Sequence, residues 1–127
     1  MGLLKDHLEM SSTLEKALET YRAPDEWPII MDAGFYTVYH MVEAIHALDC
    51  TDTSTFADGF DLLDRILVPQ GIGRDFVSKF EFLFYFRRGA IYGAHFPSEK
   101  QVRTFIETSK AALRSARAFY EKKATSP

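Results

Sequence analysis

Two arginines, a tyrosine and a histidine lie close together in the second half of the chain, at Arg87, Arg88, Tyr92 and His95. An arginine can bind a phosphate through two parallel hydrogen bonds and can stabilise a developing negative charge. A nearby histidine can act as a general base towards a ribose 2′-hydroxyl. Because Arg88 and Tyr92 are four residues apart, they share one side of a helix. The pattern indicates phosphate or nucleotide binding, or RNA cleavage by Arg88 and His95.

The same residues also have a purely structural interpretation. Arg87 falls on the apolar side of its predicted helix, beside Phe84. A buried charge needs a partner, and Asp32, Glu43 or a second protein chain would supply one. In this interpretation Arg87 ties helices together and His95 lies in an ordinary exposed loop.

A second polar group consists of His40, Glu43 and His46, which recur every third residue in an otherwise apolar stretch. Two of them, with help from another helix, would suit a metal site in a bundle, so a metal-binding enzyme using His40 and Glu43 is one alternative. The plainer interpretation is that His40 hydrogen-bonds in the core while Glu43 balances an arginine. We regard His7 as too distant in sequence to join this group, and we expect neither a metal nor another cofactor.

Charge is unevenly distributed along the chain. Residues 1–73 carry 4 Lys/Arg and 13 Asp/Glu, whereas residues 74–127 carry 11 Lys/Arg and 5 Asp/Glu. Such asymmetry can mark a surface that binds polyanions. We favour the alternative that acidic and basic helices pair inside one bundle or across a dimer. Five basic residues share a broad face of the predicted last helix, namely Lys100, Arg103, Lys110, Arg114 and Arg117.

Helices must position all of these residues, because apolar side chains recur every three or four positions and no stretch alternates like a strand. The chain is predicted to be one all-α domain over residues 1–127, an up-and-down four-helix bundle with a short extra helix between helices two and three. Ser12 with Glu15 offers a later start for the first helix. The predicted helices cover residues 3–22, 27–48, 56–67 and 74–92, and a last one begins at residue 98.

Local signals place several helix ends. Asp25 is a plausible N-cap for the second helix, and Gly93 is expected to end the next long helix in a left-handed conformation. Ser98 and Gln101 form a capping box at the start of the last helix. The tail from Lys122 is expected to fray.

The second helix is apolar on most of its circumference, so we expect it to lie centrally or to face a partner chain. Aromatic side chains on it, such as Phe35 and Tyr39, are expected mainly to pack, although aromatic rings can also stack on bases. Gly34 within it suggests that another helix approaches closely. No apolar run reaches the about 18 residues of a membrane span, and the lone Cys50 fits a reducing cytoplasm.

Two segments of this sequence resemble the HEPN family (higher eukaryotes and prokaryotes nucleotide-binding). The first is Asp25-Glu26-Trp27 followed by residues 35–44, FYTVYHMVEA. The second is residues 87–93, RRGAIYG, followed by Phe96 and the last helix. The resemblance covers roughly residues 14–120.

This resemblance implies a four-helix bundle that forms a homodimer, often as the partner of a minimal nucleotidyltransferase in a toxin–antitoxin system. Some members are metal-independent ribonucleases with an arginine and a histidine separated by a short spacer, a spacing that Arg88 and His95 match. We expect a HEPN-like module that is not an enzyme, dimerises through the second helix and binds a nucleotide, RNA or a nucleotidyltransferase. The alternative is a toxin-like ribonuclease using Arg88 and His95. The expected ligand-binding residues are Arg87, Tyr92, His40 and Glu43.

Overall fold

The computed structural model describes residues 4–20, 26–49, 63–93 and 96–125. Long helices make up most of these residues. No strand occurs within these residues. The prediction of an all-α bundle is therefore confirmed. The helical segments are α1 (Leu4–Thr20), α2 (Trp27–Ala47), the short π-helical segment η2 (Leu63–Leu67), α4 (Arg74–Tyr92) and α5 (Glu99–Ala124).

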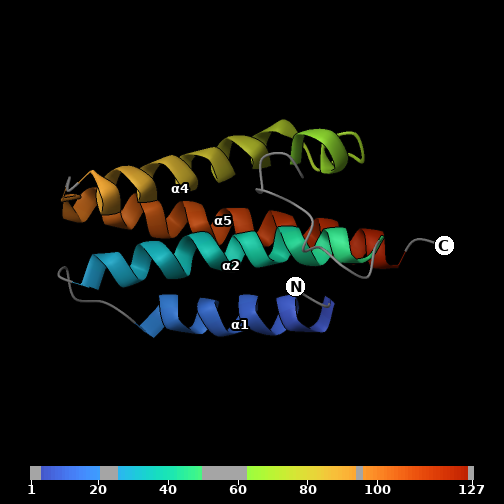
Figure 1. Ribbon diagram of the computed structural model, residues 1–127, viewed down its shortest axis with the longest axis horizontal. Coiled ribbons are helices and arrows are strands. Elements are labelled where there is room, and N and C mark those ends of the chain that lie inside the picture. The colour runs from blue at the N-terminus through green and yellow to red at the C-terminus, as the bar shows by residue number, and fades with distance from the viewer. Residues whose placement is uncertain (1–3, 21–25, 50–62, 94–95, 126–127) are drawn as a thin grey trace.

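The four long helices lie side by side and alternate in chain direction (Figure 1). α2 occupies the middle of the bundle, because it packs against α1, α4 and α5. Three neighbours can cover most of the surface of a helix. The central position of α2 therefore accounts for its apolar circumference within one chain.

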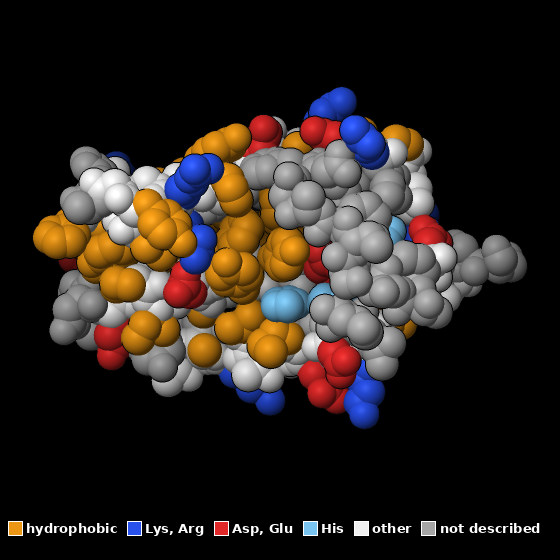
Figure 2. Space-filling view, viewed as in Figure 1, with side chains coloured by type: hydrophobic (Ala, Val, Ile, Leu, Met, Phe, Trp, Pro, Cys, Tyr) orange, Lys and Arg blue, Asp and Glu red, His pale blue; other side chains and the backbone are white. Residues whose placement is uncertain are grey.

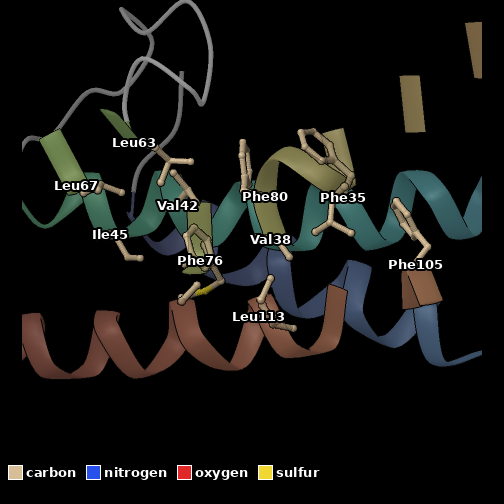
Figure 3. Packing of buried hydrophobic residues seen from close by; sticks show 14 of the residues in the cluster. Phe35, Val38, Val42, Ile45, Leu63, Leu67, Phe76, Phe80, Phe105 and Leu113 are labelled. Atoms are coloured by element: carbon tan, nitrogen blue, oxygen red, sulfur yellow. The ribbon is translucent and has the colours of Figure 1, made fainter. Parts of the chain in front are cut away.

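The main core lies between α2, η2, α4 and α5, whose apolar side chains point towards one another (Figure 3). A smaller cluster of Leu18, Ile30 and Ala33 joins α1 to α2. Removing such side chains from water is the main force that holds the helices together. The labelled members of the main core are Phe35, Val38, Val42 and Ile45 of α2, Leu63 and Leu67 of η2, Phe76 and Phe80 of α4, and Phe105 and Leu113 of α5.

Close approach of helices occurs on two sides of α2. As predicted, Gly34 admits α5, because a Cβ atom there would lie 2.6 Å from Ser109 Oγ and 2.7 Å from Phe105 Cε1. On the α1 side, the Ser11 hydroxyl donates to the Thr37 carbonyl and the Thr37 hydroxyl donates to the Ser11 carbonyl, each at 2.6 Å. These reciprocal bonds satisfy buried hydroxyls in the core. The helical periodicity of the sequence does not predict these hydrogen bonds.

The predicted start of α5 is confirmed, and α1 starts close to the predicted residue 3, whereas the alternative start at Ser12 and the N-cap at Asp25 are wrong. α5 begins with the predicted capping box of Ser98 and Gln101. Ser12 does not start α1 but lies inside it, because contacts with α2 extend the helix upstream. The N-cap of α2 is Glu26, with no side-chain cap bond, and Asp25 lies outside the described residues.

The ends of α4 and α5 also differ from expectation. Gly93 ends α4 with a φ of −86°, on the right-handed side, because its N–H still donates to the Gly89 carbonyl at 3.0 Å. The C-terminal tail continues as helix to Ala124 rather than fraying at Lys122. An ion pair of 2.9 Å between Lys123 Nζ and Asp49 Oδ2 holds this last turn against the end of α2.

The predicted helix over residues 56–67 is only partly described, because residues 56–62 lie outside the described ranges. The remainder is η2. Gly71 and Gly73, with φ values of 105° and 90°, break the chain before α4 as predicted, since positive φ favours glycine. Across the described ranges, no helix combines the length and apolar character needed to cross a membrane.

Candidate functional site

A shallow hollow on the last turns of α4 collects three of the predicted site residues. Its lining consists of Phe84, Arg87, Arg88 and Tyr92, and its volume is about 560 Å³. Phe84, Arg88 and Tyr92 follow one another at intervals of four residues, so they lie along one side of the helix. The hollow therefore combines aromatic walls with positive charge.

Arg87 is fixed within the bundle. Its Nε donates to Asp32 Oδ1 at 2.7 Å, and only 13% of its side chain is exposed. The guanidinium also lies over the rings of Tyr36 and Phe35, at 4.9 and 5.7 Å from their centroids. Cation–π contact and the ion pair together satisfy the charge that the sequence analysis placed on an apolar face. Asp32 is thus the partner of Arg87 among those that were predicted.

Arg88 has different surroundings although it is the next residue. Its side chain is exposed. Among the described residues, no carboxylate oxygen lies within 4.0 Å of it. Tyr92, one turn further along α4, is 74% exposed. The guanidinium of Arg88 can therefore direct its donors towards an anion in the hollow.

His95 lies outside the described residues, so the pairing of Arg88 with His95 stays a prediction. The chain is described again from Phe96, which is 78% exposed. The Phe96 ring meets the ring of Trp27 at the start of α2, with 5.9 Å between centroids. This contact joins the beginning of α2 to the connection between α4 and α5.

A band of hydrophobic side chains crosses the middle of one face of the molecule, with basic and acidic side chains beside it (Figure 2). Half-buried aromatic residues of α2 and α4 contact the buried Phe35. Its ring centroid lies 5.0 Å from that of Tyr36, 6.0 Å from Tyr39 and 5.8 Å from Phe84. These contacts agree with the expectation that the aromatic side chains of the second helix mainly pack.

His40, the first residue of the predicted polar group on α2, faces α1. His40 Nδ1 lies 3.0 Å from Nδ1 of His7, so one ring donates and the other accepts. The interpretation of His40 as a hydrogen-bonded core residue is supported, and the exclusion of His7 was wrong. His7 and His40 are 33 residues apart in the sequence, and they meet because α1 and α2 pack along their length. A polar residue on the α1 face, one turn before the buried Ser11, was the signal that could have indicated this contact.

Burial disfavours charge on these rings. It lowers the pKa of His40 from 6.5 to about 4, with the nearby His7 as a second cause. Burial also lowers the pKa of His7, although Glu43 and Asp6 oppose this shift. Burial lowers the pKa of His46 as well, again opposed by Glu43.

Glu43 is 3% exposed, and its charge acts on His7 and His46. Within the described ranges it forms no ion pair with Arg87 or Arg88, so the expectation that it balances one of them was wrong. Position along α2 explains the difference, because Glu43 lies about 16 Å further along the helix axis than Asp32, which pairs with Arg87. Within the same ranges no group of three or more His, Cys, Asp or Glu side chains is placed to hold a metal ion. The metal-enzyme alternative therefore gains no support.

The basic face of α5 is partly neutralised. Arg117 forms a two-pronged pair with Glu15 of α1, with N–O distances of 3.1 and 2.7 Å. Arg103 lies 3.5 Å from Glu99 in its own helix. Arg114 stays exposed. The preferred interpretation of the charge asymmetry, in which acidic and basic helices pair, is thus supported inside one chain.

A second hollow of about 700 Å³ lies at the far end of the bundle, between the end of α2 and the last turn of α5. Its carboxylate, Asp49, accepts hydrogen bonds from Lys123 Nζ at 2.9 Å and Gln70 Nε2 at 3.1 Å. The Lys123 bond is the main cause that lowers the pKa of Asp49. Because Lys123 is already paired with this carboxylate, which would itself repel an anion, the hollow of α4 is the better candidate for binding an anion.

Comparison with protein-family models, with curated proteins and with solved structures gives no match to the chain.

Proposed function

We propose that the protein is a small HEPN-like helical module that binds a phosphate-bearing nucleotide or RNA in the hollow of α4 and is not an enzyme. The observation that carries this proposal is Arg88, an exposed guanidinium without a carboxylate partner among the described residues, between the aromatic rings of Phe84 and Tyr92. Guanidinium groups pair with phosphates through two hydrogen bonds, and aromatic rings stack on bases. Arg87 supports the wall of the hollow through its pairing with Asp32.

A binding experiment in EDTA tests this function. Anisotropy of a short, labelled single-stranded RNA is measured against protein concentration at low salt. Arg88→Ala is expected to weaken binding by about tenfold or more, because a charge-assisted contact is lost. Arg114→Ala is the matched control, since it removes another exposed arginine, from α5. An equal loss in both variants, or no binding by the unmodified protein, would refute the proposal.

The runner-up is a metal-independent ribonuclease in which Arg88 stabilises the developing charge and His95 acts as the base. The exposure of Arg88 supports this reaction as well as binding. The same RNA is therefore analysed on a gel after incubation in EDTA. Cleavage that disappears in both Arg88→Ala and His95→Ala would establish the ribonuclease, whereas intact RNA would remove it.

The resemblance to the HEPN family also carries a proposal about partners. A second copy of the chain would pack against α2, at its half-buried Tyr36 and Tyr39. The protein would act in the cytoplasm, and a nucleotidyltransferase would be the cognate protein of a toxin–antitoxin pair. Sedimentation at several concentrations tests the homodimer, and a persistent monomer would contradict it. If a neighbouring gene encodes a nucleotidyltransferase, co-elution of the two proteins would support the nucleotidyltransferase as a partner. Separate elution would count against it.

A further inference from the structure

Phe84, Arg88 and Tyr92 form an aromatic–cation–aromatic row along one side of α4. An α-helix rises about 1.5 Å per residue, so about 6 Å of helix axis separate Arg88 from each ring position and about 12 Å separate the two ring positions. All three side chains line the same hollow. The row therefore offers one phosphate contact with a stacking surface on either side of it.

We infer that the hollow binds two neighbouring bases of a single-stranded nucleic acid, with the phosphate that links them on Arg88. This inference rests on the function proposed above and specifies its ligand. One base would stack on Phe84 and the other on Tyr92. Base–aromatic stacking tolerates many sequences, because every base has a flat face. The site would thus recognise the form of the strand more than its sequence.

The spacing of the row selects against a duplex. Neighbouring bases of a double helix lie about 3.4 Å apart along one strand, which is far less than the about 12 Å between the two ring positions. Only an unpaired step with its bases turned away from each other can reach both rings. A single-stranded segment should therefore bind more tightly than the same sequence in a duplex.

The charge of the row sets its salt dependence. Arg88 is the one guanidinium of the hollow without an acidic partner among the described residues, because Arg87 is paired with Asp32. A site that contacts one phosphate of a single strand should lose affinity with a slope of about 0.7 in log Kd against log salt. A slope several times larger would overturn the one-phosphate footprint.

The test compares two ligands that each carry one phosphate, adenosine 5′-monophosphate and the dinucleoside monophosphate ApA, by titration calorimetry. ApA carries less charge and one more base, so tighter binding of ApA would report stacking on the second ring. We expect an advantage of about tenfold for ApA, within the range that one stacked base contributes. A short duplex that contains ApA steps is then compared with one of its strands alone. The duplex is expected to bind more weakly than that single strand.

Leucine variants identify the two rings while keeping apolar volume. Phe84→Leu and Tyr92→Leu should each abolish the advantage of ApA over the mononucleotide. Phe82→Leu is the matched control, because Phe82 is 36% exposed on α4 and its ring contacts Phe86 and Phe105, which lie outside the row. It should keep the advantage. Circular dichroism verifies that each variant is folded.

The outcomes separate this inference from the proposed function. Equal affinity for ApA and the mononucleotide, both lost in Arg88→Ala, would overturn the dinucleotide inference and leave nucleotide binding in place. Equal binding of duplex and single strand would also overturn it. Absence of binding to every ligand would refute both.

Discussion

Arg87 and Arg88 are adjacent in the sequence and have opposite surroundings in the structure. Arg87 is paired with Asp32 and stacked on Tyr36, whereas Arg88 is exposed at the hollow. One residue turns a helical side chain through about 100°, which is enough to separate the packing role of Arg87 from the binding role proposed for Arg88.

The first prediction concerns the stability of these two positions. Arg87→Ala should lower the free energy of unfolding by about 1–2 kcal/mol, because it removes the ion pair and a cation–π contact. Arg88→Ala should change it by less than about 0.5 kcal/mol, as is usual for exposed substitutions. Urea denaturation of both variants provides the measurement. Similar losses in the two variants would show that Arg88 is also a structural residue.

The second prediction concerns the contact between His7 and His40. Because the pKa of His40 falls from 6.5 to about 4 on folding, the unfolded chain binds more protons between these values. Stability should therefore decrease as the pH falls from about 6.5 to about 4, by at most about 3 kcal/mol from this residue. The free energy of unfolding, measured from neutral pH to about pH 4, gives the slope.

A His40→Phe variant isolates this contribution, because phenylalanine fills a similar volume and does not titrate. The decrease between pH 6.5 and pH 4 should become smaller, and the remainder should come from His7 and His46, whose pKa values burial also lowers. An unchanged slope in the variant would contradict the assignment to His40.

At the scale of elements, Gly34 and Gly89 give opposite predictions for the same substitution. Gly34→Ala should destabilise the protein, because the new Cβ atom would lie 2.6 Å from Ser109 Oγ and 2.7 Å from Phe105 Cε1. Gly89→Ala should stabilise it by up to about 1 kcal/mol, since nothing lies within 4 Å of the Cβ position and alanine favours helix. Thermal unfolding of both variants is the measurement. Stabilisation by Gly34→Ala would contradict the packing of α5 on α2.

Helix positions were predictable from apolar periodicity, and the tertiary contacts were predictable only in part. The bounds of α4, residues 74–92, were predicted fully, because an uninterrupted apolar pattern is flanked by glycines. The start of α1 was harder, since Ser12 resembles a cap until α2 is seen to bury Ser11 beside it. A local signal cannot reveal what a distant helix will cover.

The candidate site shows the same division. That Arg88 and Tyr92 share a helix side follows from their spacing, and the structure places both in one hollow. Asp32 appeared in the sequence only as one of several possible partners of Arg87, because Glu43 of the same helix or a second chain could also have supplied a carboxylate. His7 was missed because its contact with His40 depends on the register of α1 against α2.

At the scale of the whole molecule, three ion pairs in the described ranges join residues far apart in the chain, and each links an acidic residue of the first half to a basic residue of the second. They are Glu15–Arg117, Asp32–Arg87 and Asp49–Lys123. The charge asymmetry therefore favours docking of the two halves within one chain. The exposed Arg88 takes part in none of these three ion pairs.

A double-mutant cycle on Glu15 and Arg117 tests this contribution. Each single alanine variant and the double variant are unfolded with urea. Because the pair is two-pronged and half-buried, the coupling energy should reach about 1 kcal/mol, at the upper end for such pairs, and should fall at high salt. A coupling near zero would show that the asymmetry has no structural role.

The central claim is that the hollow of α4 around Arg88 is the binding site of the molecule. Backbone amide shifts of the ¹⁵N-labelled protein, followed during titration with a short single-stranded RNA, test it most directly. The account predicts shifts concentrated on residues 84–92, which disappear in Arg88→Ala and persist in Arg114→Ala. Shifts centred on α5 or on the far hollow beside Asp49, or no shifts at all, would contradict it.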